Sequence, residues 1–377
     1  MTEILLSVFF ISVLLIFLST GVWVALSMIG VSTIAMTLFT TRPVGDAMAT
    51  IIWGTSSSWT LTALPLFVWM GEILFRTKLS KNLFEGLSPW MQKLPGGLIH
   101  VNVVGCAIFA AISGSSAATV ATVGKMSIPE LRKRNYPEKI LLGSLAGSGT
   151  LGLLIPPSII LIIYGVTVQE SIAKLFVAGI IPGIMIALIF MGYVILWSIF
   201  NKKEMPTILT NYSFGEKIKR SGQLIPVILL IISVIGSIYT GIATATEAAS
   251  LGVVGALTLS YFQKSLNWNT FKSSLLGATI TSCMISFILA GSAFLSLAMG
   301  FTGLPRNLAL WINSLELSPY ILIFVLMIFY IILGMFLDGI SAVVLTMAII
   351  EPMIRQTGFD MIWFGIFLVV VVEMAQI

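Results

Sequence analysis

The sequence predicts an all-α polytopic membrane protein built from two inverted repeats, each with a re-entrant helical hairpin and a broken span. Three observations predict this class. The chain of 377 residues is 58% hydrophobic and 9% charged, whereas soluble domains carry roughly 25% charged residues. Apolar runs such as 181–200 and 224–238 approach the length of a membrane span. Each half also contains a tract of glycines and hydroxyl side chains within apolar sequence, and irregular backbone persists at membrane depth only where it lines a cavity or is buried.

Apolar runs also place the individual spans. Regular spans are predicted near 3–19, 21–40, 61–77, 172–200, 222–240, 245–263 and 276–299, and an incomplete broken span is predicted from 361 onward. The tracts 97–134 and 319–357 contain breaks within longer apolar sequence, and we predict that each forms a hairpin returning to its own side. The tract 136–168 is predicted as a broken span, because Pro156 and Pro157 cannot donate hydrogen bonds to the helix ladder.

Positive charge predicts the topology. The segments proposed to be cytoplasmic are 76–96, 125–139, 201–222 and 262–275. The Lys and Arg residues outside these segments are only Arg42, Lys174, Arg306 and Arg355. If 97–134 were a simple crossing, its two basic flanks would lie on opposite sides, against the positive-inside rule. The hairpin is therefore favoured, and the second hairpin then opens to the other side.

These assignments divide the chain into a first inverted repeat, 1–200, a cytoplasmic linker, 201–223, and a second inverted repeat, 224–377. Apolar residues recur at helical spacing in 79–94 and 304–315. Both segments are predicted as amphipathic helices in the membrane interface, with packing on the protein surface as the alternative.

The interrupted tracts are the candidate functional site. The first is 113–117, which is followed by the proline break at 155–158, and the second is 338–342, whose Gly, Ser and Ala match the first at one constant offset. A helix break exposes carbonyls that suit a small cation and amides that suit a carboxylate. Paired broken segments in two halves of a membrane protein point to a transported-substrate site. The alternative is that these Gly and Ser residues only allow close helix packing.

Few acidic residues lie in apolar sequence. Asp338 and Glu373 are candidates for function because a charge inside a membrane is costly. Asp338 could instead cap the helix that follows it, and Glu247 is expected to be a cap or a packing residue. An intramembrane serine protease would need a base near Ser113, but the single histidine, His100, lies about four turns away along a helix.

Five short motifs form a specific combination: 113–119, 152–158, 246–249, 337–339 and 373–377. In these motifs the sequence resembles the large membrane subunit of TRAP (tripartite ATP-independent periplasmic) transporters, and the resemblance covers essentially the whole chain. The resemblance implies an elevator transporter of the bacterial inner membrane rather than an enzyme. It implies sodium-coupled import of an organic acid, such as a C4-dicarboxylate, a sialic or sugar acid, or a keto acid. The expected partners are a small four-helix membrane subunit and a periplasmic substrate-binding protein, with no nucleic acid.

The resemblance also implies site residues. The first sodium ion (Na+) is expected at Ala110, Ser113, Gly152, Ile155 and Pro157. The second is expected at Gly334 and Ala375, and the substrate carboxylate is expected near Ser115, Ser116, Asp338 and Ser341. Positions 110 and 375 are often Ser and Gly in the family, so the two alanines would bind through backbone carbonyls. Because the family continues with Thr-Pro-Pro-Val-Gly after the position of Ile377, we expect that the sequence is C-terminally truncated.

Three other functions stay open at this point. A stand-alone ion-coupled carboxylate symporter or a sodium/proton antiporter of the same architecture would need no partner subunits. An antiporter would more typically contain paired acids at the midplane. A membrane scaffold subunit without transport activity is the third.

Overall fold

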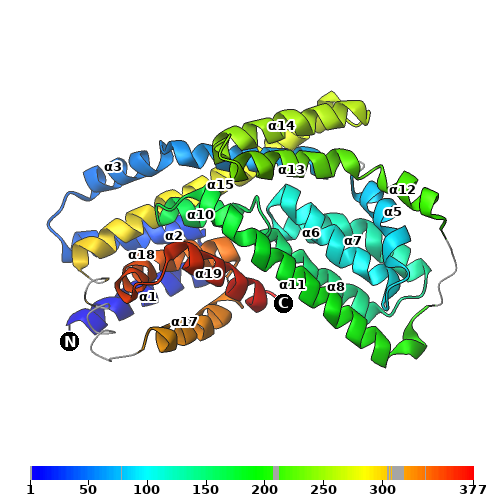
Figure 1. Cartoon of the computed structure of the whole chain (residues 1–377). Helices are drawn as coiled ribbons and strands as arrows, with labels where there is room; N and C mark the ends of the chain where they lie inside the picture. The colour runs from blue at the N-terminus through cyan, green and yellow to red at the C-terminus, as the bar shows by residue number, and fades with distance from the viewer. Residues whose placement is uncertain are drawn as a thin grey trace. The chain divides into compact units, whose positions relative to one another are not determined.

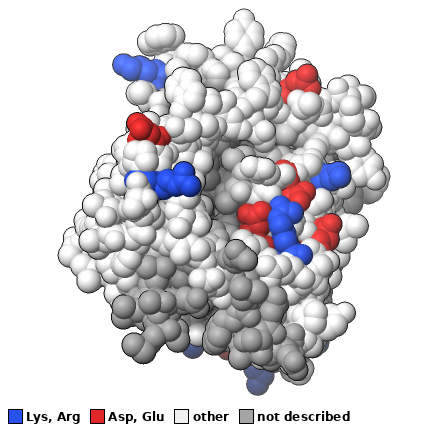
Figure 2. All heavy atoms as spheres, turned by 90° about the vertical axis from the view of Figure 1, so that its left-hand side faces the viewer, with Lys and Arg blue, Asp and Glu red and all other residues white. Residues whose placement is uncertain are grey.

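The computed structural model describes residues 2–77, 79–206, 212–303, 305, 307, 318–335 and 337–377, and every regular element in these ranges is helical (Figure 1). Among the described residues, four stretches are long and apolar enough to cross a membrane: Glu138–Thr167, Ile172–Phe200, Trp268–Thr302 and Gly339–Thr357. Two bent helix pairs raise the number to six if each pair is one span. On the face drawn in Figure 2, charged side chains are few. The prediction of an all-α, multi-pass membrane protein is confirmed.

The chain packs into two compact units that are not contiguous in sequence. The first unit contains residues 1–62, 162–171 and 281–376, and the second contains 63–161, 172–280 and 377. Each unit contains residues from both predicted halves, so the division into two inverted repeats stays a prediction.

The second unit contains the first hairpin. Its helices are α4 (Ala63–Phe75), α5 (Leu79–Met91), α6 (His100–Ser113), α7 (Ser116–Lys133), α8 (Glu138–Gly149), α9 (Leu151–Leu154), the start of α10 (Ile159–Thr167), α11 (Ile172–Phe200), α12 (Phe214–Ser221), α13 (Ile225–Tyr239), α14 (Ala245–Phe262) and the start of α15 (Trp268–Thr302). Helices α6 and α7 pack on each other and on α8, and α4 packs along α14. The predicted helical hairpin at 97–134 is therefore present as α6 and α7.

The first unit contains the second hairpin. Its helices are α1 (Thr2–Ser19), α2 (Val24–Phe39), α3 (Val44–Ser56), the ends of α10 and α15, α17 (Pro319–Gly334), α18 (Gly339–Thr357) and α19 (Met361–Ala375). The predicted hairpin at 319–357 consists of α17 and α18, and both pack against α19. The buried Ser292 hydroxyl of α15 donates to the Val344 carbonyl of α18 at 2.6 Å, which joins the long helix to the hairpin.

Some elements differ from the prediction. Helix α3 occupies sequence in which no span was predicted, and none of its residues is buried. Helix α15 begins at Trp268 rather than at residue 276, and the predicted linker contains α12. The predicted helix at 79–94 is present as α5. The predicted helix at 304–315 falls, except for residues 305 and 307, outside the described residues.

Candidate ion and substrate site

The tip of the first hairpin consists of two residues, Gly114 and Ser115. Gly114 adopts a left-handed conformation with φ +59°, and its N–H donates to the Ala110 carbonyl at 3.0 Å. A glycine in this conformation is a common helix C-terminus. Ser115 has extended backbone, and its Oγ accepts from the N–H of Ala118 at 3.5 Å. A serine here caps the N-terminus of α7. The Ser-Gly-Ser sequence therefore ends α6 and starts α7.

Hydroxyl groups bridge the two sides of this tip. Ser113 Oγ and Thr119 Oγ1 share a hydrogen bond of 2.9 Å. The Ser115 carbonyl oxygen lies within hydrogen-bond distance of both hydroxyls, 3.2 Å from Ser113 and 2.7 Å from Thr119, so one hydroxyl donates to this carbonyl while the other donates to it or to its neighbour. Ser113 and Thr119 are buried, so these bonds fix the tip within the protein interior. Thr119 was assigned no role from the sequence, although it belongs to the 113–119 motif.

The predicted broken span is interrupted where expected, after α9. Proline has no N–H, so Pro156 and Pro157 cannot donate to the carbonyls four residues earlier, those of Gly152 and Leu153. The Ser158 hydroxyl donates to the Leu153 carbonyl in place of the missing amide. The Gly152 carbonyl lies in the turn just before the break and is a candidate ligand for a cation.

The tip of the hairpin packs directly on this break. The Ile159 N–H at the start of α10 donates to the Gly114 carbonyl at 3.2 Å. A Cβ atom added at Gly114 would lie 2.6 Å from the Pro157 carbonyl oxygen, and one added at Gly152 would lie 2.6 Å from the Ser115 carbonyl carbon. Only residues without side chains allow the two backbones to come this close.

The predicted residues of the first sodium site are therefore neighbours in the second unit. Ser113 belongs to the tip, and Gly152 and Pro157 belong to the break that contacts it. The carbonyl of Ala110 already accepts from the Gly114 N–H, and the Ile155 side chain packs on Gly183 of α11. Among the described residues, no group of three His, Cys, Asp or Glu side chains gathers that could hold a metal ion. A cation at this site would be bound by carbonyl and hydroxyl oxygens.

The second predicted pair also comes together, in the first unit. A Cβ atom at Gly334, the last residue of α17, would lie 2.6 Å from the Ala375 Cβ at the end of α19. Asp338 has extended backbone before α18 and accepts from the N–H of Ser341 at 3.3 Å. The helix-capping role weighed for Asp338 is therefore confirmed. Ser341 is buried and Asp338 is exposed. Ser115 and Ser116 lie in the other unit.

Replacing Asp338 tests how much of its role is capping. Asp338→Ala should lower the free energy of unfolding by about 1 kcal/mol, because the Ser341 N–H loses its acceptor. Asp338→Asn should keep nearly all of the stability, because an amide oxygen caps as well as a carboxylate. Thermal unfolding of the purified variants measures both. Equal losses for Asn and Ala would contradict a capping role.

Two other candidate residues have structural partners. Glu247 accepts from the Thr244 N–H and hydroxyl, each at 2.8 Å, in a capping box at the start of α14. His100 Nε2 lies 2.7 Å from the Pro95 carbonyl oxygen. His100 and Ser113 are at opposite ends of α6, about 20 Å apart at the helical rise. This separation does not support a serine protease.

Paired helical hairpins and an interrupted span packed on a hydroxyl-lined tip define a polytopic membrane protein of the transporter class. The chain belongs to the family described as the tripartite ATP-independent periplasmic transporter, DctM component, whose model matches residues 11–377. It is therefore a component of a transporter and not an enzyme, as the sequence resemblance implied.

The chain is also similar in sequence to named TRAP transporter permease proteins. The chain is 30% identical over 332 residues to the C4-dicarboxylate TRAP transporter large permease protein DctM of Pseudomonas aeruginosa, covering 88% of this chain and 77% of the relative. It is 29% identical over 374 residues to the protein of the same name from Rhodobacter capsulatus, covering 95% and 84%. It is 30% identical over 362 residues to the isethionate TRAP transporter permease protein DctMQ of Oleidesulfovibrio alaskensis, covering 94% and 56%.

A solved structure has a similar fold. The YdaH transporter of Alcanivorax borkumensis superposes with a TM-score of 0.59, covering 96% of this chain and 86% of that chain. Its sequence identity is 11%, so the similarity concerns the fold alone.

Proposed function

We propose that the chain is the transport subunit of a sodium-coupled importer of organic acids in the bacterial inner membrane. The observation that supports this most directly is the packing of the Gly114–Ser115 tip on the 155–158 break. That contact gathers backbone carbonyls and a serine hydroxyl in a buried place without a carboxylate among the predicted ligands. Hard oxygen ligands of this kind suit a small alkali cation.

The substrate is proposed to be an organic anion. The N-terminus of α7 is capped by the neutral Ser115 and has no acidic residue in its first turn. Its partial positive charge is therefore available to a carboxylate. At α18 the Asp338 carboxylate already caps the helix, so Ser341 rather than Asp338 is the better candidate there for a substrate contact. The relatives named for C4-dicarboxylates and isethionate both handle organic anions.

The partners proposed are a small four-helix membrane subunit and a periplasmic substrate-binding protein. The family description names a tripartite, periplasmic system. The chain covers 56% of the DctMQ relative, which leaves room for a second component in that longer polypeptide. In this proposal sodium binds at each hairpin and orders the residues expected to contact the substrate, and transport follows an elevator mechanism. At 100 mV each net positive charge carried inward contributes roughly 2.3 kcal/mol.

Uptake into proteoliposomes tests the proposal. Vesicles containing the chain and the small subunit, supplied with binding protein and labelled succinate, should accumulate label only with an inward sodium gradient. Omission of the binding protein should abolish uptake. Equal uptake when potassium replaces sodium would refute sodium coupling, and uptake without either partner would indicate a stand-alone symporter.

Ser113→Ala should weaken sodium coupling in this assay. The substitution removes a candidate ligand and the hydroxyl that bonds to Thr119 and Ser115. We expect the half-saturating sodium concentration to rise about tenfold, equivalent to roughly 1.4 kcal/mol, with little change in the KM for the loaded binding protein. Ser233→Ala is the matched control, because that hydroxyl donates to the Leu230 carbonyl of its own helix. An unchanged sodium dependence in Ser113→Ala would remove this hydroxyl from the site.

A further inference from the structure

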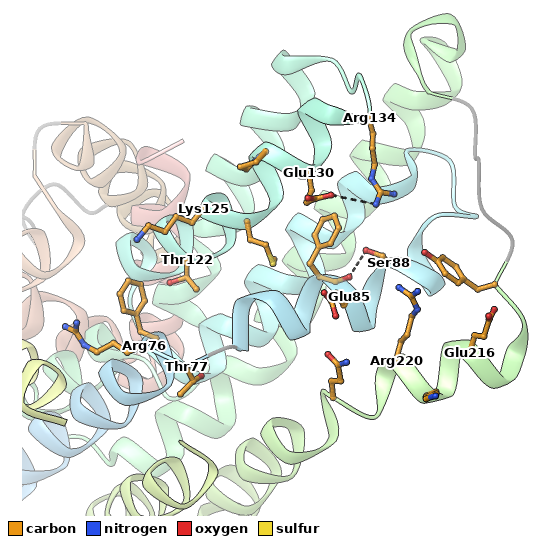
Figure 3. A pocket seen from close by; sticks show the side chains of 17 residues that line it. Arg76, Thr77, Glu85, Ser88, Thr122, Lys125, Glu130, Arg134, Glu216 and Arg220 are labelled. Atoms are coloured by element: carbon orange, nitrogen blue, oxygen red, sulfur yellow. Dashed lines mark hydrogen bonds and ion pairs between the residues drawn. The ribbon is translucent and has the colours of Figure 1, made fainter. Parts of the chain in front are cut away.

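A large cavity in the second unit is separate from the proposed ion site. It measures ≈1310 Å³ and lies among the end of α4, α5, α7 and α12. Figure 3 shows side chains from α5, α7 and α12 around the same space. The basic residues that line it are Arg76, Lys125, Arg134, Lys219 and Arg220, and the acidic ones are Glu85, Glu130 and Glu216. None of them belongs to the proposed sodium or substrate residues.

The cavity favours an anionic ligand, because two of its carboxylates are already engaged. Glu216 accepts from the Ser213 N–H at 2.9 Å and caps α12. Glu130 pairs with Lys133 at 3.3 Å and lies 3.9 Å from Arg134. Within the described ranges, Lys125 and Lys219 form no salt bridge. These two ammonium groups are available to a ligand.

The rest of the lining is apolar and hydroxyl-bearing. The lining also contains the apolar residues Phe75, Phe84, Met126 and Pro129 and the hydroxyl-bearing residues Ser88, Thr77 and Thr122. The volume exceeds the roughly 300–1,000 Å³ of pockets that hold drug-sized ligands. A small hydrated anion would fill little of this volume and would not contact the apolar side chains. An amphipathic anion would fill the cavity and contact these side chains.

The helices beside the cavity have the character of membrane-interface helices. On α12, Phe214 and Ile218 are 68% and 53% exposed. Trp90 of α5 donates from Nε1 to Ser221 Oγ at 2.7 Å, and its ring packs edge-on against Phe214. Lys217 lies over the Trp90 ring at 5.2 Å. Exposed aromatic and aliphatic residues next to lysines are typical of helices at the headgroup level of a bilayer.

We propose that this cavity binds the headgroup of an acidic phospholipid, with Lys125 and Lys219 supplying unpaired positive charge to the lining that attracts it. Basic pockets on the cytoplasmic side of membrane proteins bind acidic headgroups in this way. Most of the lining residues come from three of the four stretches predicted to be cytoplasmic, 76–96, 125–139 and 201–222, and this predicted topology places the cavity at the inner leaflet. The site is independent of the proposed transport function.

Native mass spectrometry of the purified full chain tests the site. Phosphatidylglycerol or phosphatidylcholine is titrated into the detergent-solubilised protein, and bound lipid is counted. The double variant K125Q/K219Q should bind phosphatidylglycerol more weakly by about fivefold for each charge removed, with phosphatidylcholine unchanged. The control K264Q/K272Q removes two lysines that do not line the cavity and should bind like the parent. The single variant K219Q on the exposed helix α12 serves if the double variant does not fold.

Three results would overturn the proposal. Phosphatidylglycerol affinity could be the same in K125Q/K219Q and in K264Q/K272Q. Phosphatidylcholine could bind as tightly as phosphatidylglycerol, which would indicate an apolar groove without headgroup recognition. Inorganic phosphate or succinate at millimolar concentration could displace the bound phosphatidylglycerol, which would indicate a site for soluble anions.

Discussion

Gly152→Ala is expected to abolish sodium-dependent uptake and to destabilise the protein by about 2–3 kcal/mol. The new Cβ would lie 2.6 Å from the Ser115 carbonyl carbon and 2.7 Å from both the Ser115 oxygen and the Ser116 nitrogen. All three are backbone atoms, so no side-chain rotation relieves the overlap, and overpacking of this kind typically costs 1–3 kcal/mol. The tip must move away from the break, which separates the ligands proposed for the first sodium ion. A loss of roughly 1.4 kcal/mol in ion binding is already tenfold in affinity.

Gly143→Ala is the matched control. Gly143 lies in α8, earlier in the same interrupted stretch, and a Cβ there meets nothing within 4 Å. The same substitution should be neutral or slightly stabilising, because Ala is the better helix former by about 1 kcal/mol. Uptake in proteoliposomes and the midpoint of thermal unfolding give the two readouts. If both variants retained normal uptake, the contact between tip and break would not be part of the transport site.

The breaks were predictable because their causes are local. Pro156 and Pro157 remove two amide donors whatever surrounds them, and Gly114 followed by Ser115 is a helix stop followed by a helix start. The two hairpins were predicted from these breaks together with the distribution of Lys and Arg along the sequence. Asp338 as a cap was likewise visible in its position just before an apolar run.

Other features could not be predicted because they depend on contacts between distant residues. The Ser113–Thr119 bond needs the turn geometry of the tip, although both residues lie in one motif. The charged cavity joins Arg76, Lys125 and Lys219, which the sequence showed only as separate topogenic charges. Helix α3 was missed because Gly, Ala, Thr and an Asp dilute its apolar residues. In contrast, the sequence Ser213–Glu216 is a capping-box signal that could have located α12.

The contact between Tyr164 and Gly365 provides a second test, within the first unit. Tyr164 of α10 is fully buried, and its hydroxyl donates to the Met361 carbonyl of α19 at 2.6 Å. A Cβ at Gly365 would lie 2.5 Å from Tyr164 Cε1. Because the ring is fixed by burial and by its hydrogen bond, Gly365→Ala should cost about 2 kcal/mol or more in the free energy of unfolding. Gly300→Ala, where the Cβ meets nothing within 4 Å, should cost little.

A double-mutant cycle distinguishes this overlap from a general loss of stability. Tyr164→Leu should itself be destabilising by about 2–4 kcal/mol, because it leaves a cavity and removes the hydrogen bond to the Met361 carbonyl. The shorter leucine side chain would no longer place ring atoms against residue 365, so the double variant should be more stable than the sum of the single losses by about 1 kcal/mol or more. Thermal unfolding of the four proteins measures this coupling. Strictly additive losses would show that Tyr164 and Gly365 do not couple α10 to α19. Another contact would then have to hold α10 against α19.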